Sequence, residues 1–282
     1  MSSVRTGRRA GVRRNLGGVL GGVLVALVAV AGALAAHDTW LLPTSFYASS
    51  GDTVSLYLTS GMTFPANEGA IRADRIREAA VRLAGRTTAI TSRSPAESAL
   101  VLRSRLGEPG TATLWVSLLP RTLDLTEAQV DEYLDEIGAG PAVREAWART
   151  PAPRHWRETY VKHAKTFVRV MGPRDSSWAA PVGLALEIVP ETDPTALRAG
   201  DTLRVRILRG GAPAAGVGIG LVIEGGPPSL LTADAEGRAA LVLSRQGRSL
   251  VRATDLRPPR EAGGTWESDF TTLTLVVGSP RC

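Results

Sequence analysis

The chain has 282 residues, of which 44% are hydrophobic and 21% charged, a composition that supports a packed core and excludes a disordered chain. Five of its 33 lysine and arginine residues lie in the first 36 positions, which contain no acid, so 28 basic and 27 acidic residues remain. A net charge of +1 on the remainder excludes the basic surface that nucleic-acid binding requires, and we expect no nucleic-acid partner.

Residues 1–36 have the pattern of a secretory signal peptide. A basic segment is followed by an apolar run over residues 16–34, and Ala33-Leu34-Ala35-Ala36 supplies small residues for cleavage. The alternative is an uncleaved membrane anchor, because the apolar run is close to the length that spans a bilayer. We predict cleavage after Ala35 or Ala36, a periplasmic or secreted location and no membrane span in the cleaved chain. Arg13-Arg14 forms only part of a twin-arginine motif.

The first half of the remaining chain shows mainly strand patterns. Residues 52–60 and 111–119 alternate apolar and polar side chains, as half-buried strands do, and residues 79–83 and 100–102 are shorter candidates. A helical pattern follows at Thr126, where Gln129 gives capping-box spacing. An apolar stripe then continues at helical spacing through Val130, Tyr133, Leu134 and Ile137. We expect a second helical stretch over 154–164, turning into a strand over 166–170.

The second half predicts an immunoglobulin-like sandwich. Residues 173–180 have the composition of a linker, and seven short apolar runs follow, separated by turn signals. The predicted fold is therefore mainly β, with two β-sandwich, immunoglobulin-like domains, the first carrying a helical insertion. The predicted bounds are 37–172 for the first domain and 181–280 for the second. The apolar runs are 184–189, 202–208, 217–223, 230–231, 239–243, 250–253 and 271–277.

The sequence contains no motif that predicts catalysis. Gly216-Val-Gly-Ile-Gly220 continues into an apolar strand pattern and lacks the helix of a dinucleotide loop. Asp234-Ala-Glu-Gly237 lacks the other ligands of a calcium loop and predicts a hairpin turn. The single cysteine, Cys282, excludes an internal disulfide and a cysteine-based metal site. We predict no catalytic residues, no organic cofactor and no enzymatic activity.

The three histidines are the candidate metal ligands. Cleavage after Ala36 would make His37 the first residue, so that its amine and imidazole Nδ1 could chelate Ni(II), Co(II) or Cu(II). Cleavage after Ala35 would require an amide nitrogen as well. We predict that His163 and Asp38 complete the site; a half-buried, hydrogen-bonded role is the alternative for His163. His155 is expected at the surface.

Several segments resemble a known family. His37-Asp-Thr-Trp-Leu-Leu-Pro43, Gly61-Met-Thr-Phe-Pro65 and Tyr160-Val-Lys-His-Ala-Lys165 occur in the order seen in domain-of-unknown-function family 4198. Gly200-Asp201, Asp234–Gly237 and Thr271–Leu275 resemble its second half. The resemblance implies an extracytoplasmic β protein, and some members are periplasmic components associated with nickel and cobalt uptake. No histidine-rich tract is present, and Met62 stands where a further histidine would help a metal site.

Three functions follow as hypotheses. The first is a periplasmic accessory protein that binds a transition metal and works beside membrane transport components. The alternative is a metal-free adhesion or scaffolding module, in which Trp40 is a buried anchor and sandwich edges or loops bind a partner. A third hypothesis is a copper redox enzyme with an N-terminal histidine chelate. If the His37 and His163 imidazoles lie on opposite faces, the metal-free module is favoured.

Overall fold

The computed structural model describes residues 37–261 and 263–278. The predicted signal peptide, residues 1–36, and Cys282 lie outside this range. The described chain forms three sheets and two α-helices, so the prediction of a mainly β fold with immunoglobulin-like sandwiches and a helical insertion is confirmed.

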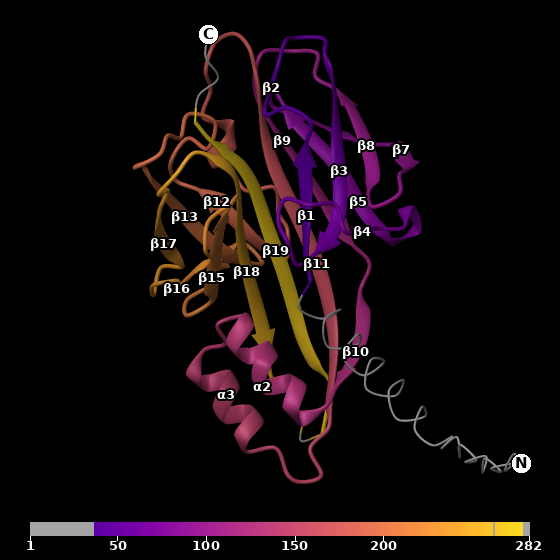
Figure 1. Cartoon of the computed structure of the whole chain (residues 1–282), viewed down its shortest axis with the longest axis vertical. Helices are drawn as coiled ribbons and strands as arrows, with labels where there is room; N and C mark the ends of the chain where they lie inside the picture. Colours follow the sequence, from indigo (N-terminus) through magenta and orange to yellow (C-terminus); the bar gives the residue numbers. More distant parts are fainter. Residues whose placement is uncertain (1–36, 262, 279–282) are drawn as a thin grey trace, which may run out of the picture.

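The largest sheet has ten strands and belongs to both halves of the chain. Two smaller sheets pack against it, one from each half (Figure 1). The strands of the large sheet are β16 (Ser229–Thr232), β15 (Gly218–Ile223), β18 (Gly247–Arg257), β19 (Trp266–Val277), β11 (Trp156–Val170), β9 (Gly110–Leu118), β5 (Ile76–Leu83) and β6 (Arg86–Ala89), with β10 (Arg121–Leu125) and β2 (Tyr47–Ala48) beside β11.

The smaller sheets each come from one half of the chain. The N-terminal sheet contains β1 (Asp38–Pro43), β3 (Thr53–Gly61), β8 (Leu100–Arg105), β7 (Ser92–Pro95) and β4 (Gly69–Ala70). The C-terminal sheet contains β12 (Leu186–Pro190), β13 (Thr202–Arg209), β14 (Ala212–Pro213) and β17 (Arg238–Val242). Two 3-10 turns, η1 (Ala73–Arg75) and η2 (Ser177–Ala179), complete the strand-bearing part.

Strands β11 and β19 join the two halves by pairing in parallel, from Glu158 opposite Trp266 to Thr166 opposite Thr274. Strand β11 continues antiparallel to β9 of the first half, and β19 lies antiparallel to β18 of the second half. The two long strands therefore run along the length of the molecule and make one continuous sheet (Figure 1).

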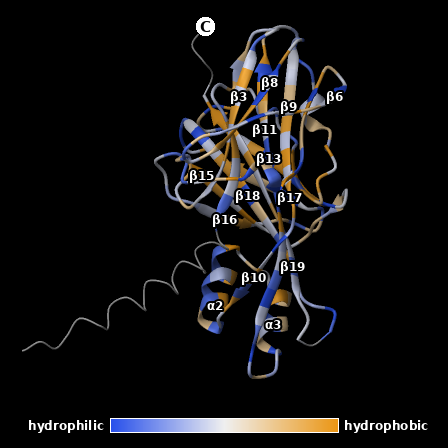
Figure 2. Ribbon diagram, turned by 90° about the vertical axis from the view of Figure 1, so that its right-hand side faces the viewer, coloured by the Kyte–Doolittle hydropathy of each residue, from blue (hydrophilic) through white to orange (hydrophobic). Residues whose placement is uncertain are grey.

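The two smaller sheets cover opposite faces of this sheet. Successive side chains of a strand point to opposite sides, so one strand can contribute to both cores. On β11, Ala164 and Val168 enter the N-terminal core, whereas Phe167 enters the C-terminal core together with Leu273 of β19. Hydrophobic residues are concentrated in the strands of this two-sandwich part of the molecule (Figure 2). The predicted domain bounds stay a prediction, since strand 156–170 contributes to both cores.

A third core lies under the helical insertion, formed by α2 (Glu127–Glu136) and α3 (Pro141–Ala148). The predicted capping box of Thr126 and Gln129 is present at the start of α2. The rings of Trp156 and Trp266 stack at 4.1 Å between their centroids, on the end of the large sheet that the helices cover.

The helix predicted over residues 154–164 is wrong. Most of these residues belong to β11, which extends from Trp156 to Val170. The second helix is instead α3, which was not predicted. The segment is rich in aromatic and β-branched residues, which favour strands. Pairing with β10 and β19 on its two sides outweighs the short helical pattern.

Candidate functional site

Strand β1 lies where the two sandwiches meet. Trp40 is fully buried, with its ring edge-on to that of Phe64 at 5.6 Å, and packs near Leu250 of the second half. The neighbouring Leu41 points into the N-terminal core instead. The hydroxyl of Thr272 on β19 donates a 2.6 Å hydrogen bond to the Thr39 carbonyl. These contacts fix the position of His37 at the start of the strand.

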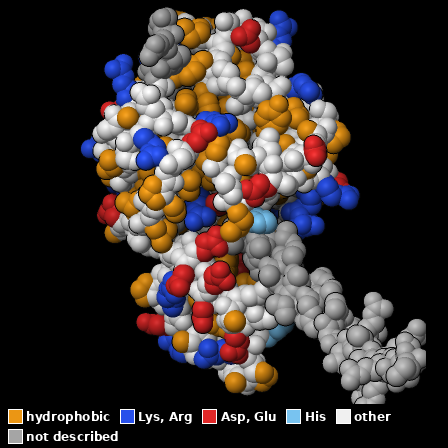
Figure 3. Space-filling view, in the orientation of Figure 1, with side chains coloured by type: hydrophobic (Ala, Val, Ile, Leu, Met, Phe, Trp, Pro, Cys, Tyr) orange, Lys and Arg blue, Asp and Glu red, His pale blue; other side chains and the backbone are white. Residues whose placement is uncertain are grey.

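A pocket of about 480 Å³ opens beside His37, and we call it the His37 pocket. Lys and Arg side chains gather beside a histidine on this face of the molecule (Figure 3). The lining residues come from β1, β3, the β3–β5 connection, η1, the ends of β9 and β10, and β11: His37, Thr39, Ser60, Glu68, Gly69, Ala70, Ile71, Arg72, Arg75, Leu118, Arg121, Tyr160 and Lys162.

Lys162 of β11 forms the inner wall of the pocket. Its buried ammonium donates a hydrogen bond to the carbonyl of His37 and lies 5.4 Å from the centre of the Tyr160 ring. Burial lowers the pKa of Lys162 to about 8, although the nearby carboxylates of Asp38 and Glu158 favour its charged form. Lys162 is therefore a cation at neutral pH that loses its proton soon above it.

The His37 imidazole has a pKa below its ordinary value. Partial burial is the main cause and the charge of Lys162 adds to it, while Glu68 and Asp38 act in the opposite direction. The Glu68 carboxylate is held by the backbone N–H groups of Met62 and Thr63, each at 2.8 Å, and these hydrogen bonds keep its pKa below the ordinary range.

Asp38 lies next to His37 but is engaged elsewhere. Its Oδ2 accepts a 2.9 Å hydrogen bond from Nη1 of Arg252 on β18, so it links the two halves of the molecule. Burial raises the pKa of Asp38, and the partner guanidinium only partly offsets this effect.

His163 lies on the other face of the large sheet from the pocket. It directly follows Lys162 in β11, so the two side chains point to opposite sides. Its Nε2 is 3.3 Å from Oδ1 of Asp269, whose other oxygen accepts a 2.8 Å hydrogen bond from Arg257. The ring is 3% exposed. The 3.3 Å contact agrees with the hydrogen bond of the alternative for His163, although the side chain is buried rather than half-buried.

The predicted ligands therefore do not converge. The structure brings Asp38 and His37 together at the junction and separates His163 from both by the thickness of the sheet. Within residues 37–261 and 263–278, no group of three or more His, Cys, Asp or Glu side chains lies close enough to hold a metal ion. His155 is largely exposed, as expected, with its Nε2 3.2 Å from Asp124.

Glu68, Arg75 and Arg121 also line the pocket and were not predicted as site residues. Glu68 follows the Gly61–Pro65 element by three positions, which is its only signal in the sequence. Arg75 directly precedes β5, and Arg121 starts β10. They come together because β5 pairs with β9 and the N–H of Leu119, between β9 and β10, donates a hydrogen bond to the Arg75 carbonyl.

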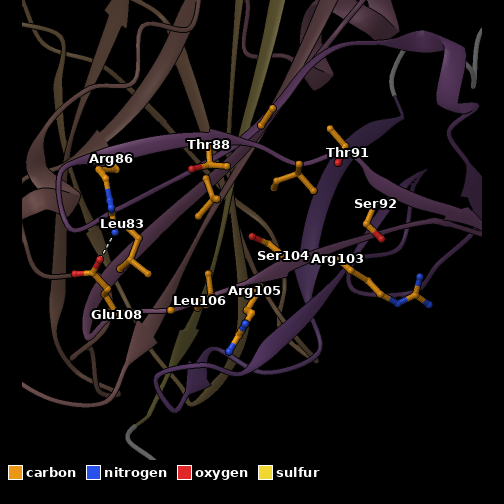
Figure 4. A pocket seen from close by; sticks show the side chains of 14 residues that line it. Leu83, Arg86, Thr88, Thr91, Ser92, Arg103, Ser104, Arg105, Leu106 and Glu108 are labelled. Atoms are coloured by element: carbon orange, nitrogen blue, oxygen red, sulfur yellow. Dashed lines mark hydrogen bonds and ion pairs between the residues drawn. The ribbon is translucent and has the colours of Figure 1, made fainter.

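A second hollow of about 710 Å³ lies at the open edge of the N-terminal sandwich, between β6 and β8 (Figure 4). Its apolar lining includes Leu83, Ile90 and Leu106, and Arg86 pairs with Glu108 at one end. Arg103 and Arg105 also line this groove, and they donate hydrogen bonds to the Ser94 hydroxyl and the Gly51 carbonyl, respectively.

A family model described as domain of unknown function (DUF4198) matches residues 34–255, so the chain belongs to this family. No curated protein matches the sequence. No helix of the described residues is long and apolar enough to cross a membrane.

Several solved structures of low sequence identity are similar to parts of this fold. The adhesin InvE of Yersinia pseudotuberculosis is 14% identical, with 83% of this chain and 58% of that chain covered, at a TM-score of 0.24. The Escherichia coli adhesin FdeC is 13% identical, with 86% and 64% covered, also at 0.24. A two-domain fibronectin type-III segment of chicken tenascin is 12% identical, with 86% and 99% covered, at 0.22. The chain spans less than two thirds of the length of either adhesin chain.

Proposed function

We propose that this DUF4198 protein is an exported accessory protein that acts as a metal-free binding module, with the His37 pocket as its ligand site. The observation that carries the proposal is the assembly of His37, Tyr160 and Lys162 around one pocket. These residues come from two distant segments, and β1 and β11 hold them rigidly at the junction of the sandwiches.

The contacts of the pocket residues support a preformed binding site. Lys162 is hydrogen-bonded to the His37 carbonyl, Glu68 to two backbone amides and Asp38 to Arg252. These hydrogen bonds hold the polar groups in and beside the pocket in place before a ligand binds. The basic, apolar and small-residue segments of positions 1–36 support export to the periplasm or the medium.

The separation of His37 and His163 supports a metal-free function. Isothermal titration of the processed protein with Ni(II), Co(II) and Cu(II), after removal of bound metals, tests this point. We expect no binding tighter than that of the His37→Ala variant. Stoichiometric binding that disappears in His37→Ala would contradict the metal-free proposal.

A transition-metal site at His37 is the second candidate, and the lowered pKa of His37 favours it, because metal ligation requires a neutral imidazole. Cleavage after Ala36 would add the amine of His37 as a second nitrogen donor. In that case His163→Ala should bind the metal as the wild type does, since His163 faces away from the pocket. A loss of affinity in His163→Ala would contradict this version of the site.

A further inference from the structure

Two arginines of the His37 pocket carry like charges close together. Arg75 stands at the end of η1 and Arg121 at the start of β10, and both line the pocket. Burial lowers the pKa of Arg75, and the charge of Arg121 lowers it further. The two cations repel each other, and an anion bound between them would offset this repulsion.

Arg75 also has a donor without a partner. Its Nη2 donates a 2.6 Å hydrogen bond to the Leu119 carbonyl, which fixes the direction of the guanidinium. Its Nε is buried and has no hydrogen-bond partner among the described residues. A buried donor without an acceptor is unfavourable, so this Nε–H indicates a missing acceptor.

Among the described residues, Arg75 and Arg121 form no ion pair. Arg72 pairs with Asp74, which also favours the charged form of Arg75, and Asp38 and Glu158 lie near Lys162. Glu68 accepts hydrogen bonds from backbone amides, which lower its pKa and keep it negatively charged. The three arginines and Lys162 of the lining outnumber this one carboxylate, so the lining carries a net positive charge.

The rest of the lining is partly apolar. Ile71, Leu118 and the ring of Tyr160 contribute to its walls. The volume of about 480 Å³ falls within the range of about 300–1,000 Å³ that is typical of small-molecule sites. An arginine fork matches the two oxygens of a carboxylate or the oxygens of a phosphate group.

We propose that the His37 pocket binds a small organic anion, with its oxyanion group between Arg75 and Arg121 and its apolar body against Ile71, Leu118 and Tyr160. The inference rests on the proposed function, since it names the ligand class of the same pocket. The ligand is a carboxylate or a phosphate monoester that carries an aromatic or aliphatic group.

Isothermal titration of the processed protein tests the inference, after metal ions have been removed with EDTA and the EDTA has been removed by gel filtration. The probes are phenylacetate, octanoate and phenyl phosphate, with neutral phenylacetamide and inorganic phosphate as the comparison compounds. We expect at least one organic anion to bind at least ten times more tightly than phenylacetamide and inorganic phosphate. Equal binding of the neutral amide, or no binding of any organic anion, would overturn the inference.

The arginines are tested by Arg121→Gln and Arg75→Lys, with Arg198→Gln in the second half as the matched control. Arg121 is exposed, and its replacement should leave the far-ultraviolet circular dichroism unchanged. Arg121→Gln should weaken anion binding at least ten-fold and Arg198→Gln should not change it. If the wild type and Arg121→Gln bind the anion with equal affinity, the proposed anion site between Arg75 and Arg121 is contradicted.

The two proposals fail in different experiments. Because EDTA removes metal ions, binding of Ni(II) at His37 would contradict the metal-free function and leave the anion result standing. Failure of every anion to bind would remove the inference and leave a metal-free module with another ligand.

Discussion

Two lysines on opposite faces of β11 show how a single strand serves both halves of the molecule. Lys162 lies at the His37 pocket, and Lys165 lies on the C-terminal side, where its Nζ is 2.7 Å from Oε1 of Glu187. Both side chains are buried. Each ammonium must therefore be compensated by neighbouring groups, because a buried charge without a partner is strongly unfavourable.

The lowered pKa of Lys162 predicts a pH dependence of stability. The folded value of about 8 lies below the ordinary 10.5, so the unfolded chain binds more protons between these values and stability rises with pH there. Relative to Lys162→Met, the wild type should gain about 2–3 kcal/mol of unfolding free energy between pH 7 and pH 10. Urea unfolding at several pH values measures this. A difference that is constant over this range would contradict the burial of a titrating amine.

The pair of Lys165 and Glu187 predicts a large effect of a single substitution. Glu187 also accepts hydrogen bonds from the backbone N–H groups of Val182 and Gly183, each at 2.9 Å. Burial would raise the pKa of Glu187, but Lys165 and these amides outweigh it and hold the pKa below its usual range. Lys165→Met should therefore destabilise the fold by about 3–5 kcal/mol, because it leaves a buried carboxylate unpaired.

The exposed pair of Arg174 and Asp193, at 2.9 Å, provides the control for this prediction. Arg174→Gln should cost at most about 1 kcal/mol in the same denaturant unfolding experiment. If Lys165→Met and Arg174→Gln lower the free energy of unfolding by similar amounts, burial does not make the Lys165–Glu187 pair more important for stability than an exposed pair.

At the scale of elements, strands with a clear period of two were predictable from the sequence. The patterns at 52–60 and 111–119 correspond to β3 and β9, and the capping box at Thr126 marks the start of α2. The seven apolar runs of the second half correspond to strands β12, β13 and β15–β19. These signals are local. Strand β3 alternates buried and more exposed residues as predicted, whereas β9 is buried at every position, because both of its faces are covered.

Strand β11 was not predictable in the same way, because its neighbours decide its conformation. Its first part shows apolar residues at helical spacing, but β19, which pairs with it, lies about a hundred residues later in the chain. Asp234–Gly237 forms a turn, as expected, with Asp234 Oδ1 accepting from the N–H of Glu236. The turn connects β16 and β17, which belong to different sheets, so the expected hairpin is wrong.

The candidate site was predictable only in part for the same reason. His37 and the segment from Tyr160 to Lys165 were identified, yet a helix would have placed His163 with Tyr160, whereas a strand places it on the other face. Arg75 and Arg121 depend on the pairing of distant strands and have no local signal.

Gly218 marks the contact between the helical insertion and the large sheet. A Cβ atom at this position would overlap the carbonyl oxygen of Ile137 at the end of α2, which is backbone and cannot rotate away. Gly218→Ala should therefore lower the unfolding free energy by more than 1 kcal/mol, in the range of overpacked sites of about 1–3 kcal/mol.

Gly107 gives a matched control for this substitution, because a Cβ atom there meets nothing within 4 Å. Gly107→Ala should change the unfolding free energy by no more than about 0.5 kcal/mol. If both alanine variants unfold at the same denaturant concentration as the wild type, the close packing of α2 on β15 is contradicted.

At the scale of the whole molecule, the shared sheet joins the two sandwiches into one structure. Strand β11 contributes to both cores, and the Thr272 and Thr274 hydroxyls of β19 donate to the carbonyls of Thr39 and Leu41 on β1. Loss of either sandwich would leave the other with an exposed face of the sheet.

This arrangement predicts a single unfolding transition. Leu56→Ala in the N-terminal core and Leu203→Ala in the C-terminal core should each cost about 2–5 kcal/mol, because both side chains are fully buried. Differential scanning calorimetry should show one transition that moves as a whole in both variants, with equal calorimetric and van't Hoff enthalpies. Two transitions, of which only one shifts in each variant, would show that the sandwiches unfold independently.

The central claim is that this protein binds its ligand in the His37 pocket, and a map of ligand-induced shifts of backbone amide resonances tests it most directly. The processed protein is titrated with the organic acids that bind in calorimetry. We predict that the shifts concentrate at residues 37–39, 68–75, 118–121 and 160–162. Shifts concentrated along the groove between β6 and β8, or spread over no continuous surface, would contradict the claim.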